Sequence, residues 1–369
     1  MGICALCHQE SPVISEALGL CGDCIRRTPE RALPHALHVH GETRKPFGLP
    51  PSPPRSEEGV GCMLCANQCV MAEGESGYCG MRSNRGGRLT CASSGSAKVS
   101  WYHDPLPTNC VASWVCPAET DAGYPAFTHT RGPEYGYFNL AVFYEACSFN
   151  CLFCQNWHFR ESAHKPGGHP AGEMAAAAHE RTSCICYFGG DPGPQLPHAL
   201  RASRLARRRA DGRILRICWE TNGSMNPRLL DQMASLSLDS GGCVKFDLKA
   251  WDENLHVALT GASNRRTLDN FARLAELTTR RPDPPLLIAS TLLVPGYVDT
   301  EEVAALATFV ASLDPSIPYS LLGFHPQFHM HDLPPTSRVH AERCEAAARA
   351  AGLERVKIGN VHVLGADYR

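Results

Sequence analysis

From about residue 138 onward, short apolar runs rich in β-branched residues alternate with longer segments of helical character. The apolar runs lie at residues 138–146, 183–190, 214–220, 242–250, 286–295 and 318–326. The helix-like segments lie at about 171–181, 197–210, 226–236, 252–259, 265–280, 300–313 and 338–351. Strands that alternate with helices in this way pair in parallel and are buried on both faces. We therefore expect an α/β fold, a partial (β/α)6 barrel of the TIM type, with its chemistry at the carboxyl ends of the strands.

The chain before this repeat has a different character, rich in cysteine, glycine and proline. Residues 1–30 form a small module containing two Cys-x-x-Cys pairs. Residues 31–59 are predicted to be a proline-rich linker with little packed structure. Residues 60–137 comprise a second cysteine-rich module and an irregular segment that wraps onto the barrel. The barrel and a C-terminal extension then occupy residues 138–369.

Composition narrows the class of protein. With 43% hydrophobic residues the chain has enough apolar material for a sizeable core, and its net charge of −2 gives no sign of a nucleic-acid partner. We expect no membrane span, since no stretch of about 18 apolar residues occurs. The first residues do not resemble a signal peptide, so we expect a cytoplasmic protein. There the 19 cysteines would stay reduced, and cysteines at short spacings are typical of metal ligands.

The most informative cysteines follow the first predicted strand. Cys147, Cys151 and Cys154 form a CxxxCxxC loop. A [4Fe–4S] cluster has four irons, so three thiolates would leave one iron open for chemistry. The alternative is a zinc site completed by a distant cysteine. The spacing and the position after a strand favour the cluster.

Two further cysteine sets precede the barrel. Cys4, Cys7, Cys21 and Cys24 make two knuckle-like pairs, which predict a closed, structural site for zinc or a single iron. The second set is Cys62, Cys65, Cys69 and Cys79. Its spacing leaves open whether it holds zinc or an auxiliary iron–sulfur cluster.

Six other cysteines are predicted to be structural. Cys184, Cys186, Cys218 and Cys243 lie on predicted buried strands, where a free cysteine behaves as a small apolar residue. Cys110 and Cys116 could ligate a metal, but a structural role is favoured.

The barrel region resembles the radical S-adenosylmethionine (SAM) superfamily over about residues 138–330. In that family CxxxCxxC binds the cluster, the amino and carboxylate groups of SAM occupy the open iron, and one electron cleaves SAM to a 5′-deoxyadenosyl radical. The resemblance implies that Phe153 lies near the adenine. It also implies that Gly189, Gly190 and Asp191, in a GGDP variant of the family's GGE-like motif, bind the methionine ammonium group.

The closer resemblance is to the pyruvate formate-lyase-activating-enzyme-like branch. It rests on Glu220-Thr221-Asn222-Gly223, on Asp247-Leu248-Lys249, on residues 256–270 and 294–299, and on Leu322-Gly323-Phe324-His325. The resemblance implies that Glu220, Thr221, Asn222, Asp247, Lys249 and His325 contact SAM or a cation beside it. That branch carries an arginine on strand five where this chain has Ser290. Asp247 and Lys249 also suit a structural ion pair, and His325 a buried core histidine.

The second cysteine set adds a finer resemblance. Residues 61–89, GCMLCANQCVMAEGESGYCGMRSNRGGRL, are similar to the leader of the radical SAM proteins of the AmmeMemoRadiSam system. The substrate of such an enzyme is left open: it is either a protein, such as a glycyl radical enzyme, or a small molecule. The resemblance also implies a reductase or flavodoxin-type electron donor. The alternative function is a metal-binding electron-transfer or scaffold protein without turnover.

Overall fold

The computed structural model describes residues 1–163, 165 and 167–368, and its centre is one eight-stranded sheet. The strand order is β16-β15-β14-β13-β12-β11-β9-β8. The strands are β8 (Val99–Pro105), β9 (Phe138–Tyr144), β11 (Thr182–Phe188), β12 (Arg216–Thr221), β13 (Val244–Asp247), β14 (Leu287–Leu293), β15 (Tyr319–Gly323) and β16 (Val356–Gly359). All neighbours pair in parallel except β8 and β9, which are antiparallel. The expected α/β architecture with a mainly parallel, partial barrel is confirmed.

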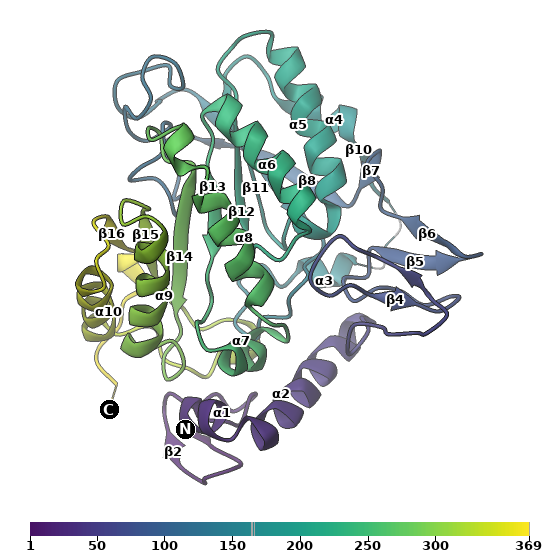
Figure 1. Ribbon diagram of the computed structural model, residues 1–369, viewed down its shortest axis with the longest axis vertical. Helices are drawn as coiled ribbons and strands as arrows, with labels where there is room; N and C mark the ends of the chain where they lie inside the picture. The colour runs from purple at the N-terminus through teal and green to yellow at the C-terminus, as the bar shows by residue number, and fades with distance from the viewer. Residues whose placement is uncertain (164, 166, 369) are drawn as a thin grey trace.

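Helices between the strands cover the sheet (Figure 1). They are α3 (Phe159–Ser162), α4 (Ala171–Ala177), α5 (Leu196–Ala210), α6 (Pro227–Ser240), α7 (Glu253–Thr260), α8 (Arg265–Ala275), α9 (Thr300–Leu313) and α10 (Arg338–Ala350). Local sequence fixes several of their ends. Asp299 caps α9 by accepting hydrogen bonds from the amides of Glu301 and Glu302, and Gly241 ends α6 in the left-handed conformation. Within the described ranges, no helix is both long enough and apolar enough to cross a bilayer.

All six predicted strands are present, but the sheet gains one strand at each edge. β8 alternates buried and exposed positions, as an edge strand with one solvated face does, and its sequence VSWYHDP lacks a continuous apolar run. β16 has four residues, of which only Val356 is buried. Neither strand carries the continuous apolar signal of a strand buried on both faces, which is why the sequence pattern missed them.

The N-terminal part forms small hairpins and two helices. The elements are β1 (Gly2–Ile3), β2 (Glu10–Ser11), α1 (Gly22–Arg27), α2 (Pro29–Arg44), β3 (Val60–Gly61), β4 (Val70–Met71), β5 (Arg82–Arg85), β6 (Arg88–Cys91), β7 (Ser96–Ala97) and β10 (His169–Pro170). The prediction of a linker with little packed structure across residues 31–59 is wrong over residues 31–44. α2 continues to Arg44 and buries Ala32, Ala36 and His40. The prolines cluster only after this helix. Treating residues 31–59 as one segment therefore hid the helical pattern of its first part.

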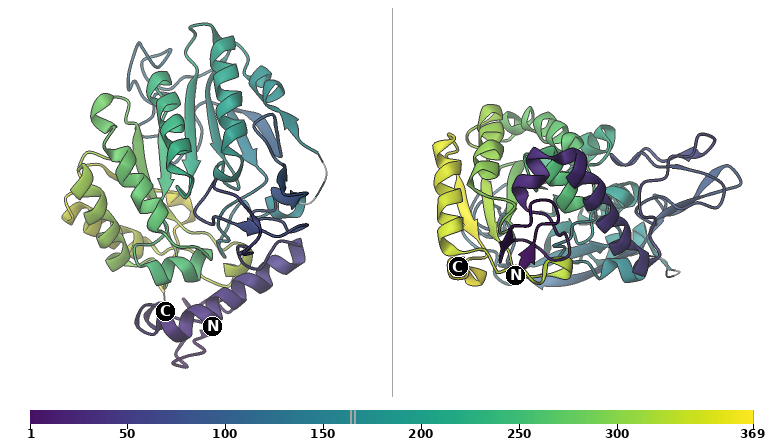
Figure 2. Two further views of the ribbon diagram at one scale, coloured as in Figure 1. Left: turned by 45° about the vertical axis from the view of Figure 1, so that its right-hand side comes forward. Right: turned by 90° about the horizontal axis from the view of Figure 1, so that it is seen from below.

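Helices α1 and α2 dock beneath α7, at the end of the molecule where the chain begins (Figures 1 and 2). On α2, His40 Nε2 lies 3.0 Å from the carbonyl oxygen of Ala258 in α7. On α1, the guanidinium of Arg26 pairs with Asp299 at 3.1 Å and with Glu302 at 3.4 Å. These contacts hold the N-terminal module against α7 and the N-terminal end of α9.

Candidate active site

A cavity of about 1070 Å³ lies at the carboxyl ends of the central strands. It is lined by Val111, Cys147, Phe149, Cys151, Phe153, Cys154, Gln155, Asn156, Arg160, Phe188, Gly189, Gly190, Asp191, Glu220, Thr221, Asn222, Lys245, Asp247, Lys249, Ser290, Leu292 and Leu322. We call it the mouth cavity. It brings together every barrel residue singled out from the sequence except His325. That histidine is exposed, and its Nδ1 lies 3.1 Å from the carbonyl oxygen of Pro326.

The cysteine loop after β9 is tied to the end of helix α7. The amide of Asn150 donates to the carbonyl of Thr260 at 2.7 Å, and the amide of Leu152 donates to the carbonyl of Leu259 at 3.1 Å. Because Cys151 lies between these two anchored residues, its thiol has a fixed place in the mouth cavity. All three cysteines of the loop line the cavity, so their sulfur atoms can reach one ligand group.

The two glycines after β11 are required by their surroundings. Gly189 and Gly190 both have positive φ, 67° and 56°. A Cβ on Gly189 would overlap the ring of Phe143, and one on Gly190 would overlap the carbonyl of Tyr144. Only glycine fits such a left-handed, crowded position without strain. The turn therefore brings the backbone to the cavity wall without side chains in the way.

Asp191 is buried in the wall of the mouth cavity, and the protein itself supplies hydrogen bonds to its carboxylate. Its Oδ1 accepts from the amide of Asn222 at 2.9 Å and the hydroxyl of Thr221 at 2.8 Å, and its Oδ2 accepts from the amide of Gly193 at 2.8 Å. Burial raises the pKa of Asp191, and these hydrogen bonds oppose the rise. Asp191 thus fixes the loop after β12 against the loop after β11.

Asn222 links the loop after β12 to the cysteine loop. Its Nδ2 lies 3.6 Å from the sulfur of Cys147 and 2.9 Å from the hydroxyl of Ser148. The carbonyl of Asn222 accepts a hydrogen bond from Thr267 at 2.7 Å. Thr267 belongs to the stretch 256–270, so part of that motif supports the site from behind instead of touching the cavity.

Asp247 and Lys249, at the end of β13, form an ion pair that faces the cysteine loop. Burial alone would lower the pKa of Lys249, but the charge of Asp247 and nearby thiolates of the loop raise it. The ammonium group lies 5.5 Å from the centre of the Phe153 ring. The second oxygen of Asp247, Oδ1, is buried without a hydrogen-bond partner. A cation and an unpaired carboxylate oxygen thus meet beside the three cysteines.

A second cavity, of about 890 Å³, adjoins the mouth cavity and shares Phe188, Glu220 and Lys245 with it. We call it the inner cavity. Its other lining residues are Tyr102, Asp104, Leu106, Thr108, Asn109, Cys110, Cys116, Pro117, Ala118, Glu119, Asn139, Cys184, Cys186, Arg216, Cys218 and Cys243. All six cysteines predicted to be structural therefore face one space.

Lys245 stands where the two cavities meet. Its ammonium group lies 2.9 Å from Glu220 Oε1, 3.2 Å from the sulfur of Cys110 and 3.1 Å from that of Cys186. Burial alone would lower the pKa of Lys245, but the surrounding thiols and the Glu220 carboxylate raise it well above its usual range. A permanent positive charge therefore separates the two cavities.

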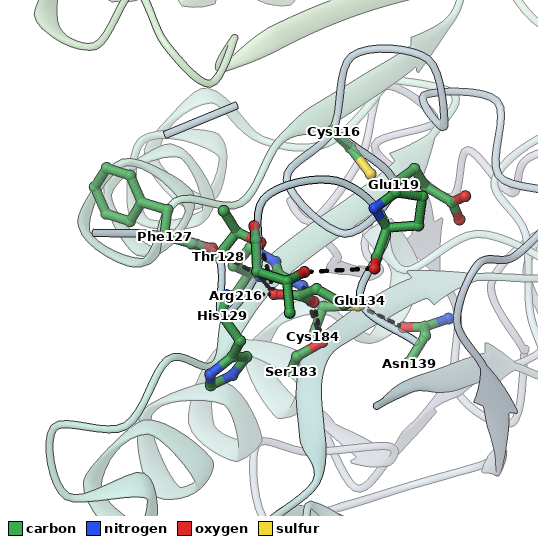
Figure 3. Close-up of polar contacts among 12 residues, drawn as sticks. Cys116, Glu119, Phe127, Thr128, His129, Glu134, Asn139, Ser183, Cys184 and Arg216 are labelled. Carbon is green, nitrogen blue, oxygen red and sulfur yellow. Dashed lines mark hydrogen bonds and ion pairs between the residues drawn. The ribbon is translucent and has the colours of Figure 1, made fainter. Parts of the chain in front are cut away.

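The far wall of the inner cavity contains a buried ion pair (Figure 3). The guanidinium of Arg216 donates to both carboxylate oxygens of Glu134, and Ser183 donates to Glu134 Oε2 at 2.7 Å. Burial raises the pKa of Glu134, but the hydrogen bonds and charge of Arg216 outweigh it and hold the pKa at about 2. The pair joins β12 to the segment before β9. It also places the charged Arg216 side chain in the wall of the inner cavity.

The two upstream cysteine sets differ in geometry. In the first set, the sulfur atoms of Cys4, Cys7, Cys21 and Cys24 all lie within 4.8 Å of one another, and Cys7 and Cys21 are 3.8 Å apart. Across the described part of the chain, this is the one such group of potential ligands. The second set surrounds a smaller, narrow cavity, which its four cysteines line together.

Sequence reasoning missed several residues that shape these sites. Lys245 lies within an apolar run that predicts a buried strand. A charged residue at such a position is a sequence signal for a functional or ion-paired side chain. Arg44 and Asn67 gave no such signal, because the first ends a helix and the second lies in a loop. Their roles depend on contacts with residues more than 80 positions away: Arg44 with Asn150, and Asn67 with Ser148.

Comparison with known proteins places the barrel region within a described superfamily. Residues 141–310 match the family model of the radical SAM superfamily. The chain is 25% identical to an uncharacterized protein of Methanocaldococcus jannaschii over 82% of this chain and 81% of that protein. It is 35% identical to the isethionate sulfite-lyase activating enzyme of Desulfovibrio desulfuricans, over 38% of this chain and 41% of the relative. The chain thus spans about two fifths of that enzyme's length.

Among solved structures, a domain of a pyruvate-formate lyase-activating enzyme from Bacteroides vulgatus is similar to 48% of this chain. The match covers 98% of that domain, with a TM-score of 0.39 and 20% sequence identity.

Proposed function

We propose that this chain, a radical SAM enzyme related to the glycyl-radical activating enzymes, binds a [4Fe–4S] cluster through Cys147, Cys151 and Cys154. The observation that carries the proposal is the convergence of the three thiols with Gly189, Gly190, Asn222, Asp247 and Lys249 on one cavity. When bound, the cluster would supply the electron that cleaves SAM to a 5′-deoxyadenosyl radical, which abstracts hydrogen from a substrate. The chain's own residues then have distinct tasks in binding and orientation.

The walls of the mouth cavity fit SAM. The Lys249 ammonium offers a partner to the carboxylate of the methionine moiety, and the unpaired Oδ1 of Asp247 offers an acceptor to a cation or ammonium group. The glycine turn leaves room along the wall, and Phe153 offers an apolar face to the adenine. Asp191 acts as a positioning residue here, because three internal hydrogen bonds already reach its carboxylate. For the remote His325 we propose no contact.

We propose that the substrate occupies the inner cavity. That cavity adjoins the mouth cavity and shares Glu220 and Lys245 with it, so a group held there would lie next to the cleaved bond. Its thiols and apolar side chains favour a small, largely uncharged group, and Lys245 can orient a polar end of it. Either a small molecule or a protein side chain inserted from outside suits this space.

Partners, location and finer classification are part of the proposal. The likeness of residues 61–89 to the AmmeMemoRadiSam leader supports membership of that group, and the likeness to activating enzymes supports a glycyl radical enzyme as an alternative substrate. A flavodoxin-type protein would supply electrons. All 19 cysteines are free thiols, which suits a reducing cytoplasm. We also propose three modules, residues 1–44, 60–137 and 138–369, of which the second contributes β8 to the central sheet, with the linker reduced to residues 45–59.

The first cysteine set is proposed to bind zinc. A zinc–sulfur distance of about 2.3 Å in a tetrahedron places sulfurs about 3.8 Å apart. Cys7 and Cys21 have this spacing. A single iron would be held in much the same way, and metal analysis distinguishes the two. The role is structural, because four thiolates leave no open position.

The experiment is anaerobic. The protein is reconstituted with iron and sulfide, mixed with SAM and a strong reductant, and assayed for 5′-deoxyadenosine by mass spectrometry. We expect product from the wild type and none from the Cys147→Ala/Cys151→Ala/Cys154→Ala variant. The variant Cys344→Ala serves as a control, because it removes a buried barrel thiol that lines neither cavity. If the wild type neither binds SAM nor forms product, the protein is a metal-binding scaffold without turnover.

A further inference from the structure

The second cysteine set carries an inference beyond the proposed function. Cys62, Cys65, Cys69 and Cys79 come from two loops, yet they line one narrow cavity. They form its wall with Leu64, Asn67, Met71, Gly77, Arg82 and Pro194. Four thiols around a shared, mostly buried space are a ligand set for metal.

The separation of the sulfur atoms distinguishes the kinds of metal centre. Thiolates around one zinc ion lie about 3.8 Å apart, as tetrahedral zinc–sulfur geometry requires. The first set meets this condition, with all four sulfurs within 4.8 Å of one another. In the second set, whose residues are all described, no three sulfurs do so. Thiolates that each bind a different iron of a cluster stand farther apart, because the metal core lies between them.

The cysteines of the barrel loop provide an internal reference. Cys147, Cys151 and Cys154, also within the described residues, fall outside the 4.8 Å spacing while they share one cavity. The sulfurs of the second set and of the barrel loop are therefore both spread more widely than those of the first set, as thiolates on separate irons of a cluster are. The amide of Tyr78, which lies 3.4 Å from the sulfur of Cys69, adds the kind of N–H···S contact that tunes such clusters.

The second set is also connected directly to the barrel loop. Asn67, two residues after Cys65, donates through Nδ2 to the carbonyl of Ser148 at 2.7 Å, and Ser148 adjoins Cys147. The amide of Ala66 donates to the carbonyl of Ser224 at 2.8 Å. The segment that carries the second cysteine set is therefore hydrogen-bonded directly to the loop that carries Cys147.

Arg44 fills the space between the two sets. Its side chain is 1% exposed, and it interacts electrostatically with both Cys79 and Cys147. It donates to the carbonyls of Tyr78 and Pro50, and its guanidinium stacks on the Tyr78 ring at 3.5 Å from the centroid. A buried cation there would reduce the repulsion between two clusters with anionic thiolate ligands.

We propose that Cys62, Cys65, Cys69 and Cys79 bind a second iron–sulfur cluster, which relays electrons to the cluster of the barrel loop. A one-electron donor of the flavodoxin class reduces the second cluster, which is reoxidised as it passes that electron to the first. No bond is made or broken in this step. The relay rests on the proposed function, whereas the metal assignment does not.

The metal assignment is tested in the variant that lacks Cys147, Cys151 and Cys154, so failure of the proposed function does not affect the result. After anaerobic reconstitution we expect about four iron and four acid-labile sulfide per chain, the content of one cubane cluster. Adding Cys65→Ala and Cys69→Ala should abolish both. Adding Cys4→Ala and Cys7→Ala instead should leave sulfide unchanged and remove zinc. Two zinc ions per chain with no sulfide, or no metal at the second set, would overturn the assignment.

The relay is tested in a chain with an intact barrel loop. The Cys65→Ala/Cys69→Ala variant is compared with wild type for 5′-deoxyadenosine formation with a flavodoxin and its reductase, and then with dithionite. We expect at least a tenfold slower rate with the protein donor and a much smaller loss with dithionite, which reaches the first cluster by itself. Equal rates with the protein donor would refute the relay while leaving the cluster in place.

Discussion

The first and second cysteine sets each comprise four thiols, but the structure separates them clearly. Cys4, Cys7, Cys21 and Cys24 bring their sulfurs within 4.8 Å of one another, whereas the second set spreads around a cavity. The first set is bound to the barrel through helices α1 and α2, while the second is bonded to the loop that carries Cys147. The comparison teaches that cysteine spacing along the chain predicts metal binding, but the space between the sulfurs indicates which metal centre fits.

The largest effect is expected when the first set is removed. The Cys21→Ser/Cys24→Ser variant should lose zinc and several kcal/mol of stability in the N-terminal module, because metal binding free energy is folding free energy in such modules. Limited proteolysis should then cut within residues 1–44. The matched variant Cys65→Ser/Cys69→Ser should retain zinc and resist cleavage there. Equal protection of residues 1–44 in both variants would show that the first set does not stabilise the N-terminal module more than the second set does.

The next effect concerns acid and the docking of α2. Burial lowers the pKa of His40 from 6.5 to about 4, so the folded state favours the neutral ring. This contribution to stability is fully present above pH 6.5 and is lost as pH falls through the folded pKa near 4. By linkage it amounts to at most on the order of 3 kcal/mol.

Hydrogen exchange should therefore quicken in α2 between pH 7 and pH 4.5, while α5, which packs against α4 and α6, stays protected. The His40→Gln variant should flatten this dependence, and His38→Gln, which changes an exposed residue on the same helix, should leave it intact. A steep pH dependence that persists in His40→Gln would assign the effect to another group.

A smaller effect is expected from Arg44→Met, which removes the buried cation between the second set and the barrel loop. Carbonyls of Tyr78 and Pro50 would lose their donor, which costs roughly 1–3 kcal/mol. Thermal unfolding measures this loss. The reduction potentials of both clusters should also become more negative, because a positive charge near each is gone. Unchanged potentials would mean that Arg44 is only a structural residue.

The smallest effect is expected from Asn67→Ala. The side chain makes one buried hydrogen bond to Ser148, worth about 1 kcal/mol, so folding and metal content should change little. The magnetic interaction between the two reduced clusters, seen as broadening in the electron paramagnetic resonance (EPR) spectrum, should weaken. The variant Asn84→Ala, which breaks a hydrogen bond within the second module alone, provides the control. Identical broadening in both variants would remove Asn67 from the electronic contact.

The barrel was predictable because its strands are continuous apolar runs bounded by glycine and acidic turns. The residues at their carboxyl ends, from Asp191 to Lys249, could be placed together because parallel strands end at one edge of a sheet. The exposure of His325 could not be predicted, since a loop following a strand can turn toward the cavity or away from it. Helix α2 was obscured by the prolines beside it.

The contacts that couple the modules lay outside the reach of sequence patterns. Arg44, Asn67 and the inner cavity depend on tertiary packing between distant segments. Four of the six thiols of that cavity, those of Cys184, Cys186, Cys218 and Cys243, were expected to be small apolar core residues. These four do lie on or beside strands, but alternation along β11 turns Cys184 and Cys186 to the same face, where Cys186 meets the ammonium group of Lys245.

The most direct test of the central claim is the EPR spectrum of the reduced Cys65→Ala/Cys69→Ala variant with and without SAM. In this variant the cluster of Cys147, Cys151 and Cys154 is observed alone. If three thiolates leave one iron open, SAM should bind that iron and shift the signal, and SAM labelled with ¹⁵N at its amino group should add a hyperfine coupling. A cluster signal that SAM leaves unchanged would contradict the account.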